Sequence, residues 1–298
     1  MKPNLSNLTL CASLLLIFGC GANQPPPASK SRDAVLLVRH EGKYGVLRDG
    51  LFEPLVETED KEISRIALSL DGRRAAAITS ENRIALFAPG KTDFLLLGGS
   101  DGRQSMRTAP NIFAIAWLPD EKKLLVQTND TVFDLYDLKG EWVERLLDTS
   151  RNELSLRCPV WSPDGNKLAF IAGDDLWIAD RKANSVRQLT FTRAVEDDPA
   201  WSADALWIYF SSDMDAPHIG RPDADFERDI YRVRPNGLNL KRLTTDRGEE
   251  ARPVSCGPDE VLFARRGVVS GVLKLDVATG ERTEIANGEF EPIGFIRL

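Results

Sequence analysis

A short motif recurs along this chain and constrains its fold more than any other feature. The stretch VWSPDGNKLAF (160–170) contains the end of a strand, a tight turn at Pro163-Asp164-Gly165 and the start of a second strand. Pro fixes one turn dihedral and Gly supplies the positive φ that the return needs, so the stretch predicts a β-hairpin. The stretches AWLPDEKKLLV (116–126) and AWSADALWIYF (200–210) follow the same pattern. A hairpin that recurs about every 40 to 50 residues indicates a repeat architecture.

Turn aspartates mark the repeat at spacings of 49, 44, 40 and 55 residues: Asp71, Asp120, Asp164, Asp204 and Asp259. Each aspartate is followed by three segments of alternating apolar and polar residues, for example NKLAFIA, DDLWIADR and SVRQLTF after Asp164. Alternation with a period of two predicts half-buried strands. Four strands in each unit are typical of a blade of a β-propeller.

The two ends of the chain supply one further blade. Residues 35–57 contain three strand-like segments, and Pro292–Leu298 is a strand-like segment without a partner. Pairing the two ends removes an exposed sheet edge. We therefore predict an all-β fold in which residues 34–298 form a six-bladed β-propeller of four-stranded antiparallel blades. Its ring is closed by pairing of the N- and C-terminal strands.

Tryptophans form one column of the repeat, three residues before the turn aspartate. Trp117, Trp161 and Trp201 occupy this column, and Leu68 and Cys256 are expected in the matching positions. Large aromatic side chains at equivalent positions of successive blades predict packing between the blades.

The repeats resemble the WD40-like repeats of TolB-type propellers. The resemblance rests on VWSPDGNKLAFIA with RQLT (187–190), and on AWSADALWIYFSSD with DIYRV (229–233) and KRLT (241–244). It covers roughly residues 34–298 and implies a propeller that serves as an interaction domain or as an appendage of a peptidase. TolB is a soluble periplasmic protein with an additional N-terminal α/β domain, for which we expect no counterpart here, so the resemblance does not identify a partner.

The N-terminal residues are typical of an export signal. Lys2 precedes the apolar run LTLCASLLLIFG, which is too short to span a membrane. The ending IFGC resembles a bacterial lipobox, which implies cleavage before Cys20 and a lipid on that cysteine. Residues 1–20 are then a signal peptide, and the proline-rich residues 21–33 are a tether. An uncleaved anchor or a plain secretory signal remains the alternative.

This resemblance implies a lipid-anchored protein of the bacterial cell envelope. Gly21 stands where an inner-membrane retention signal usually has Asp, which favours the outer membrane, facing the periplasm. The partners expected there are envelope proteins of unknown identity and the membrane itself, through Cys20.

Composition argues against several other classes of function. A net charge of −7 with scattered basic residues lacks the clustered basic face of a nucleic-acid-binding protein. With His40 and His218 as the only histidines and no CxxC pair, the usual zinc and iron ligand sets cannot be assembled. Residues 98–102 match GxSxG, but no apolar helical face follows them. We therefore predict a protein that is not an enzyme and needs no cofactor.

The cysteines of the propeller occupy different places in the repeat. Cys256 is expected in the tryptophan column, and Cys158 in the loop that enters its blade. Bridged cysteines need Cα atoms within about 7 Å, so these places argue against a disulfide.

The largest departure from the repeat is an insertion in the fifth blade, SSDMDAPHIGRPDADFERD (211–229). Strand directions alternate, so this loop should emerge on the same side as the connections between blades, opposite the PDG turns. We predict that an acidic face with arginine counter-charges forms there and binds a partner. Its candidate residues are Arg157, Glu196, Asp197, Asp198, Asp213, Asp215, His218, Arg221, Asp223, Asp225, Glu227, Asp229, Glu249, Glu250 and Arg252.

Several functions are open for this face. The preferred one is docking of an envelope protein, with the propeller as a non-enzymatic binding or scaffold module, because functional residues concentrate on loops held by rigid scaffolds. The alternative is a sensor of a small solute or Ca²⁺, with Asp213, Asp215, Asp223 and Asp225 as weak ligand candidates that lack the glycine of known calcium loops. A second alternative is an enzyme that acts on glycans through a carboxylate pair such as Asp197 and Asp213. A solvated loop that only keeps the surface soluble is the remaining possibility.

Overall fold

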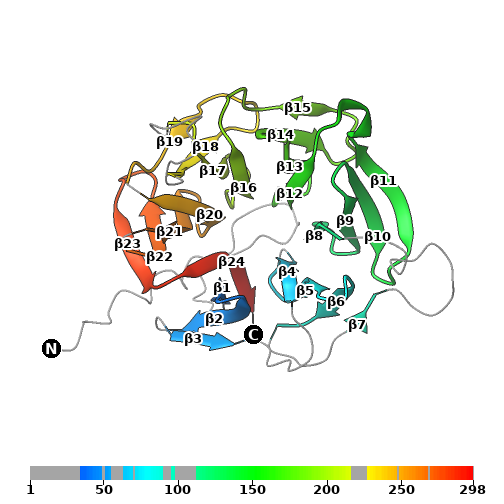
Figure 1. Cartoon of the computed structure of the whole chain (residues 1–298), viewed down its shortest axis with the longest axis horizontal. Coiled ribbons are helices and arrows are strands. Elements are labelled where there is room, and N and C mark those ends of the chain that lie inside the picture. Colours follow the sequence, from blue (N-terminus) through cyan, green and yellow to red (C-terminus); the bar gives the residue numbers. More distant parts are fainter. Residues whose placement is uncertain are drawn as a thin grey trace, which may run out of the picture.

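The computed structural model describes residues 34–48, 51–54, 63–69, 71–89, 95–97, 112–215, 227–246, 248–267 and 269–297. Six four-stranded antiparallel sheets follow one another around a ring (Figure 1). The predicted six-bladed propeller is confirmed. Within the described residues, no helix is long and apolar enough to cross a membrane.

The blades are numbered in chain order, and the strands of each are given from the inside of the ring outward. Blade 1 is β24 (Phe290–Arg297), β1 (Ala34–His40), β2 (Lys43–Arg48) and β3 (Leu51–Pro54). Blade 2 is β4 (Ile63–Leu68), β5 (Ala75–Thr79), β6 (Ile84–Phe87) and β7 (Leu95–Leu96). Blade 3 is β8 (Ala114–Trp117), β9 (Lys123–Asn129), β10 (Val132–Asp137) and β11 (Trp142–Asp148), followed by the 3-10 helix η3 (Ser150–Asn152).

The remaining blades each use four consecutive strands. Blade 4 is β12 (Leu156–Trp161), β13 (Lys167–Ala172), β14 (Asp175–Asp180) and β15 (Val186–Gln188). Blade 5 is β16 (Glu196–Trp201), β17 (Ile208–Ser212), β18 (Asp229–Val233) and β19 (Lys241–Arg242). Blade 6 is β20 (Glu249–Ser255), β21 (Glu260–Arg266), β22 (Gly271–Asp276) and β23 (Arg282–Asn287).

Ring closure joins the two ends of the described chain. β24 pairs antiparallel with β1, from Ala34 opposite Arg297 to His40 opposite Phe290. The C-terminal strand thus completes the blade that the N-terminal strands begin, as predicted. This pairing satisfies the backbone of an edge that would otherwise be open.

The PDG turns have the geometry that their sequence predicts. In blade 4 the Ser162 hydroxyl donates a hydrogen bond to Asp164 (2.5 Å), and Asp164 in turn accepts one from the amide of Asn166 (3.1 Å). Gly165 has φ +71°, and a Cβ there would lie 3.0 Å from Pro119 of the preceding blade. Only glycine combines this φ with this close approach.

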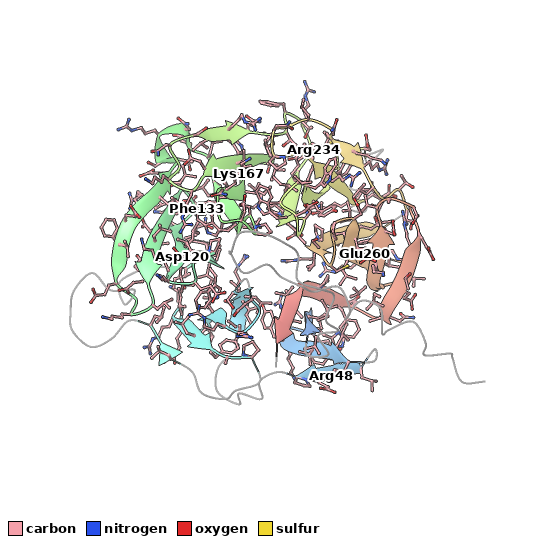
Figure 2. All side chains as sticks on the ribbon, turned by 180° about the vertical axis from the view of Figure 1, so that it is seen from behind. Arg48, Asp120, Phe133, Lys167, Arg234 and Glu260 are labelled. Atoms are coloured by element: carbon pink, nitrogen blue, oxygen red, sulfur yellow. The ribbon has the colours of Figure 1, made fainter. Side chains whose placement is uncertain are left out.

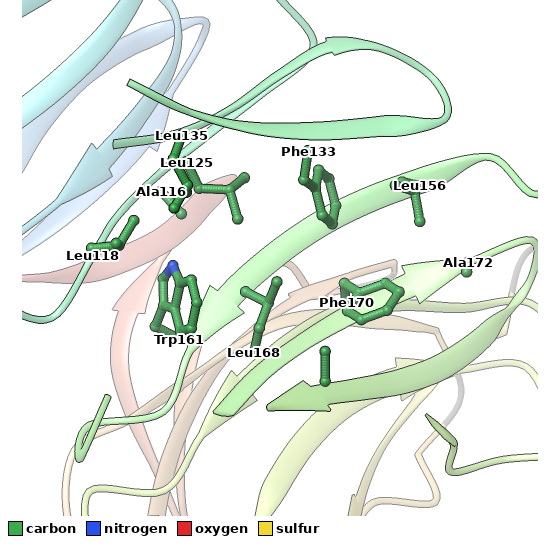
Figure 3. Close-up of a cluster of buried hydrophobic side chains, with 11 residues drawn as sticks. Ala116, Leu118, Leu125, Phe133, Leu135, Leu156, Trp161, Leu168, Phe170 and Ala172 are labelled. Carbon is green, nitrogen blue, oxygen red and sulfur yellow. The ribbon is translucent and has the colours of Figure 1, made fainter. Parts of the chain in front are cut away.

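Side chains fill the space between the sheets around the whole ring (Figure 2). The second strand of blade 4 is buried over Leu168–Ala172 on both of its faces because blades stack against each other. Trp161 lies beside Leu118 and Leu168 at the interface of blades 3 and 4 (Figure 3). In the same cluster the Phe133 and Phe170 rings meet edge to face at 5.8 Å.

The tryptophan column packs between blades, as predicted. Trp117 and Trp201 are 5% and 6% exposed, and each indole Nε1–H donates to a carbonyl of the preceding blade, Ala67 (3.2 Å) and Val160 (3.1 Å). The predicted position of Cys256 is wrong by one residue. The blade 6 hairpin is one residue shorter, so Cys256 begins the turn as Ser162 does in blade 4, and Ser255 takes the tryptophan position.

The cysteine positions settle the question of a disulfide. Cys158 and Cys256 form no disulfide. Cys158 lies inside β12 and not in an entry loop, and Cys256 is buried in the cluster between blades 6 and 1.

Candidate functional site

One face of the ring gathers the connections between blades and the turns between second and third strands; we call it the connection face. Arg157 donates to the carbonyl oxygens of Gly173, in the β13–β14 turn, and of Glu196, at the start of β16. Asp213, just after β17, accepts a hydrogen bond from the amide of Val195 (2.7 Å). Arg228 and Glu249 form a parallel β-bridge. The structure therefore brings these turns and connections together on the side opposite the PDG turns.

The innermost strands of blades 4, 5 and 6 carry a bulge at the same place. The ladder register shifts between Arg157 and Val160, and at the equivalent points of β16 and β20. Cys158, Asp198 and Arg252 there adopt φ of +51°, +51° and +57°. Each precedes a proline, which lacks the N–H of a ladder hydrogen bond, and a bulge accommodates this loss.

The bulges of blades 5 and 6 border a charged cavity of about 210 Å³ between these two blades. Its lining residues come from the bulges, from β21 and from the segment before β18: Asp197, Asp198, Arg228, Glu249, Ala251, Arg252, Ala264 and Arg266. Apart from the two alanines, the lining consists of three arginines and three carboxylates. Such a lining suits a polar ligand rather than an apolar one.

Arginines accompany each carboxylate of the cavity. Asp197 lies 3.6 Å from Arg157 and 3.8 Å from Arg228. Asp198 lies 3.4 Å from Arg252, and Glu249 lies 3.6 Å from Arg266. Around the cavity the fold thus places as many arginines as acids, whereas the acidic character of the whole face stays a prediction.

Burial dominates the titration of the groups beneath the bulges. The Cys158 thiol donates to Asp197 (3.2 Å), and burial raises the pKa of this thiol well above its usual range. Burial also raises the pKa of Asp198, although the adjacent Arg252 lowers it. Atoms of Cys158, Asp197 and Asp198 lie within 4.8 Å of one another. A thiol that stays protonated, with arginines on both sides, is a poor ligand for a cation.

Predicted face residues that are buried cannot meet a partner directly. Glu196 and Glu250 are fully buried and Asp229 is 3% exposed, so their assignment to a binding surface is wrong. Glu196 accepts hydrogen bonds from the Leu176 amide (2.8 Å) and the Thr192 hydroxyl (3.3 Å), which hold its side chain beneath the connection. Asp229 accepts one from Arg242 (2.6 Å). Glu196 and Asp229 thus fasten strand ends inside the blades.

The other predicted residues divide between structural contacts and the undescribed part of the chain. Asp213 is bonded to the Val195 amide, and Asp215 accepts from the Tyr231 hydroxyl (2.9 Å) and faces Arg242 (3.8 Å). Glu227 is partly exposed beside Arg228. Several candidates lie outside the described residues: Cys20, His218, Arg221, Asp223, Asp225 and the GxSxG segment 98–102.

The carboxylate pair considered for glycan chemistry is engaged elsewhere. Asp197 faces two arginines, and an oxygen of Asp213 holds a backbone amide. A general acid in such an enzyme needs a raised pKa within a cleft. Asp198 combines a raised pKa with a place in the cavity, but it faces Arg252 directly.

Sequence reasoning missed residues that matter on this face. Arg228 and Arg266 line the cavity, and Phe191, in the connection between β15 and β16, is 78% exposed. The sequence does contain a signal for Phe191, because this aromatic residue directly follows the RQLT segment, where a connection between blades begins. Arg266 gave no such signal, because only the pairing of β20 with β21 brings it next to Glu249.

Comparison with known proteins agrees with this architecture. The model of the N-terminal region of dipeptidyl peptidase IV matches residues 119–210. The protein TolB homolog of Chlorobium luteolum is 31% identical over 136 residues, which are 41% of this chain and 27% of that protein. The chain thus matches about a quarter of the length of this curated relative.

Solved structures share the fold over most of the chain. A putative TolB from Agrobacterium tumefaciens superposes with a TM-score of 0.61 and 16% identity, covering 88% of this chain and 91% of that one. A chain of the nidogen/laminin complex superposes with a TM-score of 0.64 and 12% identity, covering 88% and 97%. At these identities the structures show the fold alone. The chain is a six-bladed β-propeller that resembles the TolB homologues.

Proposed function

We propose that this protein is a non-enzymatic protein-binding or scaffold module of the bacterial cell envelope, which docks a partner on its connection face. The single observation that carries the proposal is Phe191, an aromatic side chain 78% exposed in the connection between β15 and β16. Aromatic residues surrounded by polar groups are the usual anchors of protein interfaces.

The surroundings of Phe191 suit a polar rim. Asp174 is 68% exposed in the nearby β13–β14 turn, and Arg193 is exposed two residues after Phe191. The Thr192 amide lies 3.4 Å from Asp175, and the Thr192 hydroxyl lies 3.3 Å from Glu196, so the connection is attached to blades 4 and 5. A preformed loop loses less entropy on binding than a mobile one.

The similarity to TolB homologues and to a chain solved in the nidogen/laminin complex supports a binding role. The lipobox-like IFGC sequence supports anchoring through a lipid on Cys20 after removal of residues 1–20. Residues 21–33 would then tether the propeller to the outer membrane on its periplasmic side.

The docking proposal is tested by crosslinking in membranes, followed by pull-down of the full-length protein. The test variant is Phe191→Ser combined with Asp174→Lys. The matched control is Leu238→Ser, which removes a 62% exposed leucine from the β18–β19 hairpin on the opposite face. We expect one or a few envelope proteins that the native chain and the control recover and the test variant loses. Equal recovery by all three proteins would refute docking at Phe191.

Anchoring is tested separately with Cys20→Ser. We expect the native chain in the membrane fraction with a lipid-modified N-terminal peptide by mass spectrometry, and the variant without that lipid. An unmodified native N-terminus at Cys20, or a native chain that keeps residues 1–19, would refute the lipoprotein proposal.

One observation favours a second candidate function. The cavity between blades 5 and 6 has the charged, convergent lining expected of a propeller that binds a small solute.

A further inference from the structure

Hydrogen-bond donors of two arginines in the cavity are not used by the described residues. The nearest carboxylate oxygen to an Arg228 nitrogen lies 3.8 Å away, and the Arg228 Nε is buried without a partner. The guanidinium of Arg252 lies 3.4 Å from Asp198 and 3.9 Å from Glu291. An N–H···O hydrogen bond needs about 2.7–3.2 Å between nitrogen and oxygen, so both guanidinium groups form ion pairs with these carboxylates but no hydrogen bonds. Each guanidinium can therefore still donate to a ligand.

Acceptors in the same cavity are also underused. Glu249 lies 3.6 Å from Arg266, too far for a hydrogen bond, and its side chain is 29% exposed. Among the residues that the structure describes, Asp198 receives only a long contact from the backbone amide of Arg252 (3.3 Å) besides its ion pair. A carboxylate can accept about four hydrogen bonds, so both retain acceptor capacity.

The charge balance restricts the ligand. The lining carries three arginines and three carboxylates, so it is neutral overall when all are ionised. A dianion such as phosphate would meet three carboxylates, and a divalent cation would meet three arginines. A molecule with one charge of each sign satisfies the unused donors and acceptors without adding net charge.

The size of the cavity restricts the ligand as well. About 210 Å³ holds several waters or one molecule of amino-acid size, since a water occupies about 30 Å³ in the liquid. The lining comes from three separate segments: the β16 bulge, the segment before β18 and the paired strands β20 and β21. Rigid strands therefore fix most of the polar groups in place.

We propose that this cavity binds a small zwitterion of the α-amino-acid class. Arg228 and Arg252 hold its carboxylate, and Asp198 and Glu249 hold its ammonium group. Arginine suits this role because its planar fork presents paired donors to a carboxylate. The proposal goes beyond protein docking at Phe191 and does not depend on it.

Isothermal titration of the purified full-length protein tests the proposal. The probes are the common α-amino acids, each added alone at neutral pH. Acetate provides the carboxylate without the ammonium, methylamine provides the ammonium without the carboxylate, and inorganic phosphate provides a dianion. We expect saturable binding of at least one amino acid, at least about tenfold tighter than acetate, methylamine or phosphate.

Two variants identify the cavity as the binding site. Arg228→Gln removes one guanidinium and Glu249→Gln removes one carboxylate, and each should weaken binding about tenfold or more. Arg73→Gln is the matched control, because Arg73 is 66% exposed on a PDG-type turn of the opposite face. Its affinity should equal that of the native protein. The thermal unfolding midpoint of each variant verifies that it is folded.

Defined outcomes would overturn the proposal. One is the absence of saturable binding of any amino acid up to about 10 mM, which would mean that water alone fills the cavity. Another is acetate binding as tightly as the best amino acid, which would remove the need for an ammonium group. A third is unchanged affinity in folded Arg228→Gln and Glu249→Gln proteins, which would place the ligand elsewhere. If the Arg228→Gln and Glu249→Gln proteins lose amino-acid binding but still dock a partner at Phe191, the cavity and the docking surface are independent sites, as proposed.

Discussion

Glu250 is a fully buried glutamate whose carboxylate destabilises the fold at neutral pH. Its side chain has no exposed surface, and neither oxygen makes a hydrogen bond among the described residues. Burial raises its pKa to about 7; the nearby Thr244 hydroxyl and Arg282 lower it, but by less. Glu196 occupies the same position one blade earlier, six residues after the threonine of the LT motif, and there the carboxylate is hydrogen-bonded.

The size of the effect follows from proton linkage. The pKa of Glu250 rises from 4.5 to about 7, so the folded protein holds a proton over a range in which the unfolded chain has lost it. Stability therefore falls as pH rises through this range, by about 1.4 kcal/mol per pH unit for this group. The loss reaches about 3 kcal/mol above pH 7 and is absent below pH 4.5. Glutamine at this position cannot ionise and should escape that loss.

The assay is urea unfolding of native protein and Glu250→Gln at about pH 5 and about pH 8, followed by fluorescence of the buried tryptophans. We expect the variant to be about 3 kcal/mol more stable at the higher pH and nearly equal to the native protein at the lower one. Glu284→Gln, on the exposed part of β23, is the matched control and should change stability by less than about 0.5 kcal/mol at either pH. A gain from Glu250→Gln that is the same at both pH values, or no gain at all, would refute the reasoning.

Three further predictions concern packing, ion pairing and ring closure. Trp201→Phe should lower the free energy of unfolding in urea by about 1 kcal/mol more than Trp161→Phe does. The reason is that the Trp201 indole donates to Val160, whereas the Trp161 Nε1 has no partner among the described residues. Equal losses in the two variants would contradict this. Arg242→Met should destabilise the protein more at about pH 8 than at about pH 5. Asp229 is 3% exposed, so burial raises its pKa, and the bonded Arg242 opposes that rise. A loss of stability that is the same at both pH values in the same assay would show that packing alone is responsible. Deletion of residues 290–298 should expose β1 as an open edge and cause association in size-exclusion chromatography, and a stable monomer would argue against closure through β24.

The blade count could be predicted because it depends on local patterns, and ring closure followed from the strands left without a partner at the two ends of the chain. Strand alternation, the PDG turns and the tryptophan column are each recognisable within a few residues of sequence. They recur at similar spacings in successive blades, so each supports the others. The one-residue error at Cys256 arose because the blade 6 hairpin is shorter, which alternation alone does not reveal. The side of the ring on which β17 ends and β18 begins also followed from strand alternation.

The character of the connection face was decided by tertiary structure. The sequence places Asp197 and Asp198 near other acids, but the fold brings Arg228 beside Asp197 and Arg252 beside Asp198. The β20–β21 pairing brings Arg266 beside Glu249. Glu196 and Glu250 looked like surface carboxylates, yet both turn inward, because their side chains follow the strand start and not the exposed connection.

The physical reason for this division is how far apart in the sequence the residues lie that determine each property. Strand, turn and repeat follow from backbone sterics and side-chain alternation within a few residues, so the sequence alone determined a six-bladed propeller. Charge pairing and burial depend on which segments meet across two blades, up to 54 residues apart for Asp198 and Arg252. Only the assembled ring could show that three arginines and three carboxylates line one cavity on the predicted face.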